Sequence, residues 1–264
     1  MGEAMGQMDA RILQRFGAAH RAAVRAEWAA AEATGVPLTI VDDGTLLLGT
    51  APTMTSTMFN RALGVAEHPE LLPTALEFFA HHGVRGDVTL AEQDLPPGVE
   101  PRLRLDVHVG SPDSAETPTV DGLLIRTVEP EVEDDVADWT RVVVEANAPP
   151  PEIAHLWRRM APFMIRTPRW THLVGSIDGR VVAAGSLFEA DDVGWQSWAS
   201  VVPAARGRGI QRALIDARSR LAARHGCSLV AAWALADAHS SANLTRAALP
   251  RVAGRVVVSS ADLG

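Results

Sequence analysis

The chain of 264 residues contains no tyrosine and no lysine, and its only cysteine is Cys227. A single cysteine excludes an internal disulfide and a cysteine-rich zinc site. No apolar run approaches the roughly 18 residues of a membrane-spanning helix, and the first residues lack the charged-then-apolar pattern of a signal peptide. We therefore expect a cytoplasmic protein with no metal and no membrane partner.

Positive charge is scarce as well, because 24 basic residues, all arginines, face 32 acidic ones and the formal net charge is −8. An acidic balance argues against general nucleic-acid binding, which depends on neutralising phosphates. It is compatible with a cationic or amine substrate. With 47% hydrophobic and 21% charged residues, the whole chain can be globular, as one large domain or two ordinary ones.

One segment reads as a linker. Residues 110–119, "GSPDSAETPT", are rich in proline, serine and threonine and have no apolar periodicity. We place a domain boundary there and predict two domains, residues 1–118 and residues 119–264.

The C-terminal half shows alternating strand and helix patterns, with a hairpin turn at Asp178-Gly179. Strands are expected at 122–128, 171–190 (a hairpin), 195–202 and 228–235, with a final strand or strand pair at 252–260. Helices are expected at 131–146, from about 150, from the end of the fourth strand to about 225, and at 240–248.

The N-terminal half repeats part of this rhythm. A helix over 9–34 is followed by a hairpin that turns at Asp43-Gly44, a strand-like segment at 56–64, a helix at 69–83 and a strand at 84–90. We interpret this as a degenerate pseudo-repeat, although two α/β units can share such a rhythm without being copies. The predicted fold class is α/β, with a mixed central sheet flanked by helices in each of two tandem domains.

The stretch "VVPAARGRGIQRALI", residues 201–215, joins a strand directly to a helix. The first N–H groups of a helix have no partner within it, and with the helix dipole they form an anion site. Gly207 and Gly209 permit close approach of the backbone, and Arg206 and Arg208 add donors suited to phosphate. The alternative is a glycine-rich turn with solvated arginines. Nucleoside triphosphate and dinucleotide loops fit poorly, because their characteristic glycines and lysine are absent.

This stretch resembles the acyl-CoA-binding motif of the GNAT (GCN5-related N-acetyltransferase) superfamily, Arg/Gln-x-x-Gly-x-Gly/Ala, with Gln211 where a small residue is usual. The resemblance implies that backbone N–H groups of the loop hold the CoA pyrophosphate and that the preceding strand pairs with the pantetheine arm. The residues so implied are Ala199, Ser200, Val201, Val202, Arg206, Gly207, Arg208, Gly209, Ile210 and Gln211.

A second stretch, "SSANLTRAAL" at 240–249, is similar to the family pattern Ser-x-x-Asn-x-x-Arg-x-Gly-Phe. The resemblance implies that Ser240 and Asn243 contact the cofactor, the alternative being a helix-capping serine and a surface amide. Together the two stretches extend the resemblance over about residues 122–264. They imply that the N-terminal half is a GNAT-like copy without the acyl-CoA loop.

The resemblance also implies an activity. We expect an N-acetyltransferase that moves the acetyl group of acetyl-CoA, or the acyl group of another acyl-CoA, to a primary amine of a small molecule by direct attack. The alternative is a non-catalytic acyl-CoA-binding or interaction module. A monomer or a homodimer is expected.

The catalytic groups are less clearly marked. Many family members use a tyrosine as general acid at the position of Leu244, and this chain has none. Glu189 and His172 are the candidate bases, each of which could instead be an ordinary surface charge. Trp195 and Trp198 are three positions apart on a strand, so they are expected on opposite faces, one in the core and the other beside the acceptor.

Overall fold

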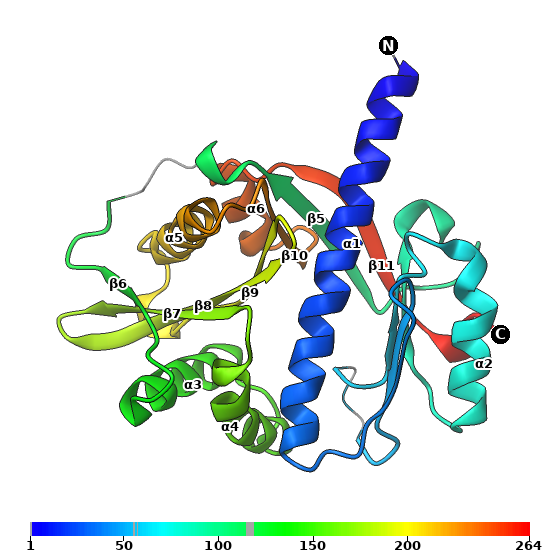
Figure 1. Ribbon diagram of the computed structural model, residues 1–264, viewed down its shortest axis with the longest axis horizontal. Coiled ribbons are helices and arrows are strands. Elements are labelled where there is room, and N and C mark those ends of the chain that lie inside the picture. The colour runs from blue at the N-terminus through cyan, green and yellow to red at the C-terminus, as the bar shows by residue number, and fades with distance from the viewer. Residues whose placement is uncertain (1, 55, 57, 115–118) are drawn as a thin grey trace.

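A computed structural model of the chain describes residues 2–54, 56, 58–114 and 119–264. Its helices flank one mixed sheet, which has 11 strands in the described residues (Figure 1). The strands are β1 Thr39–Asp42, β2 Leu47–Thr50, β3 Arg61–Leu63, β4 Asp87–Ala91, β5 Leu103–Gly110, β6 Leu124–Thr127, β7 Trp170–Ile177, β8 Arg180–Ala190, β9 Val193–Val201, β10 Leu229–Leu235 and β11 Arg251–Ser259. The α-helices are α1 Gly2–Ala33, α2 Leu72–His81, α3 Glu133–Asn147, α4 Pro151–Arg166, α5 Ile210–Arg224 and α6 His239–Arg246.

The strand order is β1-β2-β3-β4-β11-β5-β10-β9-β8-β7-β6. The same run of elements occurs on both sides of its centre. In one half the hairpin β1–β2 leads to the parallel strands β3 and β4 joined by α2, and in the other the hairpin β7–β8 leads to β9 and β10 joined by α5. The predicted mixed α/β class is therefore confirmed, but the two expected sheets form one continuous sheet.

The centre of the sheet differs most from the sequence expectation. Strand β11, from the C-terminal end, lies between β4 and β5 and pairs antiparallel with both, as a single strand rather than a strand pair. Strand β5 was not predicted at all, although "LRLDVHVG" alternates strictly between apolar and polar residues, which is the signal for a strand. The expected boundary at residue 118 lies outside the described residues, so the division into two domains stays a prediction.

Helices cover both faces. In the half that contains β7, β8 and β9, α3 and α4 lie on one face and α5 and α6 on the other (Figure 1). Helix α1 crosses between the halves: Phe16 packs 5.3 Å from the ring of Trp195, whereas Trp28 is fully buried with Leu47 and Phe59 of the first half. None of the helices in the described ranges is long and apolar enough to cross a membrane.

A buried ion-pair cluster links α1, β11 and the junction between β3 and α2. The carboxylate of Glu67 accepts from Arg255 Nη2 at 3.1 Å and lies 3.7 Å from Arg21 Nη1. The Glu67 side chain is only 7% exposed, and a Cβ on Gly17 of α1 would lie 2.6 Å from its carboxyl carbon. Helix α1 therefore packs directly onto this carboxylate.

This cluster predicts a large loss of stability for Glu67→Ala. Removing one partner of a buried pair leaves the other charge uncompensated, which costs roughly 3–5 kcal/mol. Urea unfolding should show this loss. Glu70→Ala is the matched control, because Glu70 is 69% exposed in the same junction and its loss should cost under about 0.5 kcal/mol. Equal effects of the two substitutions would contradict the assignment.

Candidate functional site

The site is a gap in the sheet between β9 and β10. These strands pair in parallel over only three residue pairs, ending at Trp195 and Ala231. Beyond that point β9 continues beside β8, and β10 continues beside β5. The separation leaves a cavity of about 520 Å³, whose walls also include α1, α5 and α6.

A β-bulge bends β9 where it leaves β10. The pairing register with β8 shifts between Ala184 and Ser186, and Trp198 adopts a left-handed conformation with φ of 54°. Such a backbone costs of order 1–3 kcal/mol. Trp195 packs against Phe16 and Trp198 donates to Glu27, both on α1, so the expectation of opposite faces is wrong, because the extra residue of the bulge interrupts the alternation.

The Arg-Gly-Arg-Gly loop lies between the end of β9 and the start of α5. It begins with a 3₁₀ turn at Pro203–Ala205 and ends at Ile210, the first residue of the helix. Gly207 and Gly209 have φ of 79° and 82°, a region that side chains rarely adopt. The first-turn N–H groups of α5 have no acceptor within the helix, and Arg208 has no hydrogen bond or ion pair with any described residue.

Several of the expected cofactor residues come together at this end of the gap. Ala199, Ser200, Gln211 and Ser240 all line the cavity, from β9, α5 and α6. Asn243 Nδ2 donates to Gln211 Oε1 at 2.6 Å, which connects the two helices. Gln211, at the one position that departs from the motif, therefore has a defined partner.

Other expected cofactor residues are already engaged. The N–H of Val202 donates to Val182 O at 3.0 Å, so this residue belongs to the β8 side. The Arg206 guanidinium donates to Val201 O at 3.1 Å and Ala146 O at 2.7 Å. In the structure the Arg206 side chain therefore connects the loop to α3, whereas the sequence predicts that it contacts phosphate.

Glu189 lies away from the cavity. It pairs across the sheet with Gly194, in the section where β9 and β10 are still joined. Its Oε1 is 2.6 Å from His225 Nδ1 at the C-terminal end of α5. The structure therefore does not bring this candidate base to the site.

His172 is a core residue, only 2% exposed. Its Nδ1 is 2.8 Å from Ser186 Oγ, and its ring packs against Trp139 and Trp170. Burial lowers its pKa to about 4, so the imidazole is neutral at pH 7. It does not line the cavity between β9 and β10.

The carboxylate that lines the cavity is Glu27, on α1. It is 6% exposed, and its Oε1 accepts a hydrogen bond from Trp198 Nε1 at 2.9 Å. Burial raises its pKa. Sequence reasoning missed this residue because it lies in the other half of the chain. The available signal was its position among the alanines of "AVRAEWAAAEA", on a helix stripe that turns out to be buried.

Three further basic side chains, those of His20, Arg61 and Arg218, line the same cavity. His20 stacks on Trp195 with ring centroids 4.6 Å apart, and burial, followed by the charge of Arg61, lowers its pKa well below the ordinary value. Arg218 is fully buried and donates to the carbonyl oxygens of residues 186, 197 and 214. Burial lowers its pKa to about 9.

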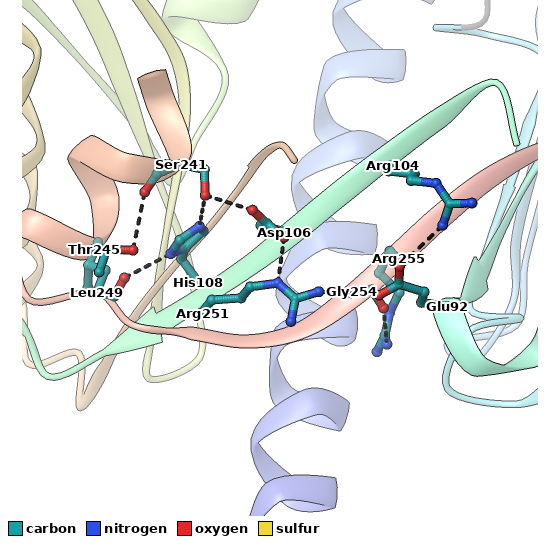
Figure 2. A network of polar contacts seen from close by, with 10 residues as sticks. All are labelled: Glu92, Arg104, Asp106, His108, Ser241, Thr245, Leu249, Arg251, Gly254 and Arg255. Carbon is teal, nitrogen blue, oxygen red and sulfur yellow. Dashed lines mark hydrogen bonds and ion pairs between the residues drawn. The ribbon is translucent and has the colours of Figure 1, made fainter. Parts of the chain in front are cut away.

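A polar network fixes α6 to the centre of the sheet (Figure 2). Ser241 Oγ on α6 is 2.7 Å from Asp106 Oδ2 and 3.0 Å from His108 Nε2, both on β5. His108 Nδ1 lies 2.8 Å from Leu249 O, and Arg251 Nε of β11 donates to Asp106 Oδ1 at 2.5 Å. The position of α6, and of its two expected cofactor residues, is therefore set by strands from both halves.

This network contains a serine, a histidine and an aspartate, but not in the order of a nucleophilic triad. A triad has the carboxylate on the far nitrogen of the histidine, whereas here Asp106 contacts Ser241 and the far nitrogen of His108 faces a backbone carbonyl. Burial acts to raise the pKa of Asp106, but hydrogen bonds from Ser241 and Arg251 lower it overall. The arrangement is structural.

The equivalent junction of the first half offers no anion site. Where β3 leads toward α2, the Glu67 carboxylate is directed to the buried arginines that it neutralises. A phosphate there would meet like charge. Among the described residues, no group of three or more histidine, cysteine, aspartate or glutamate side chains could hold a metal ion.

Residues 133–248 match the sequence model of the Acetyltransferase (GNAT) family. A comparison with curated proteins gives no significant match.

Solved structures of similar fold include a GCN5-related N-acetyltransferase from Kribbella flavida, with 16% identity, a TM-score of 0.59, and coverage of 90% of this chain and 95% of that one. Another, from Sphaerobacter thermophilus, has 19% identity, a TM-score of 0.56, and coverage of 81% and 80%. A tandem GNAT protein from the clavulanic acid biosynthesis pathway has 17% identity, a TM-score of 0.56, and coverage of 81% and 77%. At these identities the likeness shows the fold.

The loop geometry predicts that Gly209→Val weakens CoA binding at least tenfold in calorimetry, because a branched side chain at φ of 82° must distort the start of α5. Gly226→Val is the matched control. Gly226 has the same φ of 82° and follows the other end of α5, so it imposes a similar strain far from the loop. Equal CoA affinities of the two variants would refute the assignment.

The two junctions predict one CoA per chain, bound at the second-half loop. Calorimetric titration of the intact chain should give a stoichiometry close to one, because the first junction holds a buried carboxylate where the phosphates would lie. A stoichiometry of two would contradict this.

Proposed function

We propose that the protein transfers the acetyl group of acetyl-CoA to a primary amine of a small molecule, because residues 133–248 match the sequence model of the acetyltransferase (GNAT) family. The observation that carries the proposal is the cavity of about 520 Å³ between β9 and β10, whose wall contains a buried carboxylate and Gln211, which lies two residues after Gly209 of the loop. Acyl donor and amine can meet in such a gap without crossing an intact sheet.

The acyl-CoA side is formed by the loop and the open edge of β9. The first-turn N–H groups of α5 and the positive end of its dipole suit the pyrophosphate, and the Arg208 guanidinium is available beside them. Ala199 is exposed on the part of β9 that has left β10. Main-chain groups there suit the amides of the pantetheine arm, and one N–H there would polarise the thioester carbonyl.

The amine side is formed by Glu27 and the indoles around it. A carboxylate whose pKa is raised by burial is a better proton acceptor than an exposed one. The hydrogen bond from Trp198 Nε1 fixes one of its oxygens. We therefore assign Glu27, in place of the two bases expected from sequence, as the group that takes the proton from the acceptor nitrogen.

The transfer balances with this single base. A bond forms between the amine nitrogen and the thioester carbonyl carbon, the carbon–sulfur bond breaks, and sulfur leaves with the electron pair. An acceptor that arrives as an ammonium first loses one proton to solvent; on attack Glu27 takes the second proton from nitrogen, and the thiolate takes one from water. Leu244 lines the cavity and supplies no proton, in line with the absence of tyrosine from the chain.

The direct test is release of CoA thiol from acetyl-CoA in the presence of a panel of primary amines, with the N-acetyl product identified by mass spectrometry. Acetylation of at least one amine above the rate without enzyme supports the proposal. Tight CoA binding with no turnover on any amine would favour the non-catalytic binding module.

The assignment of Glu27 predicts the pH dependence. Because the carboxyl must be ionised and the amine neutral, kcat/KM should rise with pH and reach a plateau, without an alkaline fall from a phenolic acid. Glu27→Gln should lower kcat/KM roughly 100-fold or more with CoA affinity unchanged. Glu32→Gln is the control, since Glu32 lies on the exposed side of the same helix, paired with Arg25 at 3.3 Å.

Initial rates from about pH 6 to pH 10 cover the relevant ionisations, with enzyme stability checked at each value. An alkaline decline that is not due to unfolding or thioester hydrolysis would reveal a proton donor other than water. An unaltered rate in Glu27→Gln would exclude that residue as the base.

A further inference from the structure

One charged side chain in the cavity wall, that of Arg61, has no hydrogen-bond or ion-pair partner among the described residues. Arg61, on β3 of the first half, lines the same cavity as Glu27. Its Nε is buried and makes no hydrogen bond, and no ion pair joins its guanidinium to any described residue. Its Cζ lies 5.9 Å from the ring centroid of Trp28. This cation–π contact stabilises the guanidinium on one face only.

The surrounding residues do not compensate this charge at short range. Asp87 is opposite Arg61 across the β3–β4 pairing, but its Oδ1 accepts from Arg102 Nη1 at 2.8 Å. Arg218, the other arginine in the cavity wall, has three backbone carbonyls as acceptors. Burial lowers the pKa of Arg61, while Glu27 and Asp87 act against that shift. A partly buried cation without a close counter-ion is unfavourable unless something else binds it.

Glu27 and Arg61 therefore present opposite charges to one cavity without forming an ion pair with each other. A molecule that carries an ammonium and a carboxylate a few bonds apart can satisfy both. Guanidinium is suited to a carboxylate because its planar fork can donate two parallel hydrogen bonds. Neighbouring His20 is held neutral by burial and adds no charge to this pair.

We propose that the amine acceptor is a zwitterion of the amino-acid type, with its ammonium at Glu27 and its carboxylate at Arg61. This inference rests on the proposed acyl transfer, since it names the acceptor class for that reaction. The rest of the wall indicates a large apolar side chain. Four indoles line the cavity, those of Trp157, Trp195, Trp198 and Trp233.

The test uses three probes that share one side chain: L-phenylalanine, L-phenylalaninamide, which lacks the carboxylate, and 3-phenylpropanoate, which lacks the ammonium. Leucine, leucinamide and 4-methylpentanoate form a second series with a smaller side chain. Binding to the full-length protein is measured by calorimetry and by quenching of the indole fluorescence, without acetyl-CoA. In at least one series, loss of either charge should weaken binding tenfold or more.

Variants then test whether Arg61 binds the carboxylate of the amino acid. Arg61→Met should abolish the preference for the amino acid over its amide, and Arg61→Lys should restore part of it. Arg104→Met is the control, because Arg104 lies exposed on β5 with Glu92 as its partner. The melting temperature of Arg61→Met should not fall, since the substitution removes a partly buried charge that has no close counter-ion. A purely structural arginine would instead lower stability and leave the ratio of acid to amide unchanged.

The outcomes separate this proposal from the acyl-transfer proposal. Acetylation of amines with no preference for the zwitterion, or with a preference that Arg61→Met leaves intact, overturns the zwitterion proposal alone. Failure of both amino acids to bind also overturns it. Zwitterion binding that depends on Arg61, without acetylation of any amine, supports the binding site and overturns the acyl-transfer role.

Discussion

The separation of β9 from β10 is the constraint on which the rest of the site depends. Two adjacent parallel strands would normally pair along their length, so the gap persists only because each strand is held on its other side. Strand β10 pairs with β5 from Leu235 back to Val230, and β9 pairs with β8 on both sides of its bulge. If β5 were absent, β10 would have an unpaired edge, and further pairing with β9 would then close the gap.

The first half of the chain therefore contributes to the site, although the Glu67 carboxylate occupies its own junction between β3 and α2. It provides β5 as the support for β10 and, through Asp106 and His108, fixes the helix that faces the loop. It also provides α1 and β3, which place Glu27 and Arg61 in the cavity wall. The first half therefore forms part of the cavity that we assign to acyl transfer, and mutations that change Glu27 of α1 or Arg61 of β3 should affect acceptor binding more than acyl-CoA binding.

The sequence was informative where a local pattern determines the structure. The loop with Gly207 and Gly209 and the hairpin turn at Asp178-Gly179 both follow from residues close together in the chain. It failed where distant segments meet. No periodicity within 251–259 indicates that β11 inserts beside β5, and a base chosen from the strands of the second half could not be Glu27, which a helix of the first half brings to the site.

The bulge at Trp198 shows how the local and distant constraints combine. A left-handed tryptophan is unfavourable by itself, and an isolated β9 would relax to regular alternation. Its indole N–H donates to Glu27 on α1, and its ring packs edge-on against Trp157 of α4 at 5.2 Å. The hydrogen bond to Glu27 offsets part of the backbone cost only when α1 is in place, so the bend in β9 and the position of the Glu27 carboxylate support each other. The cavity therefore depends on residues of both halves.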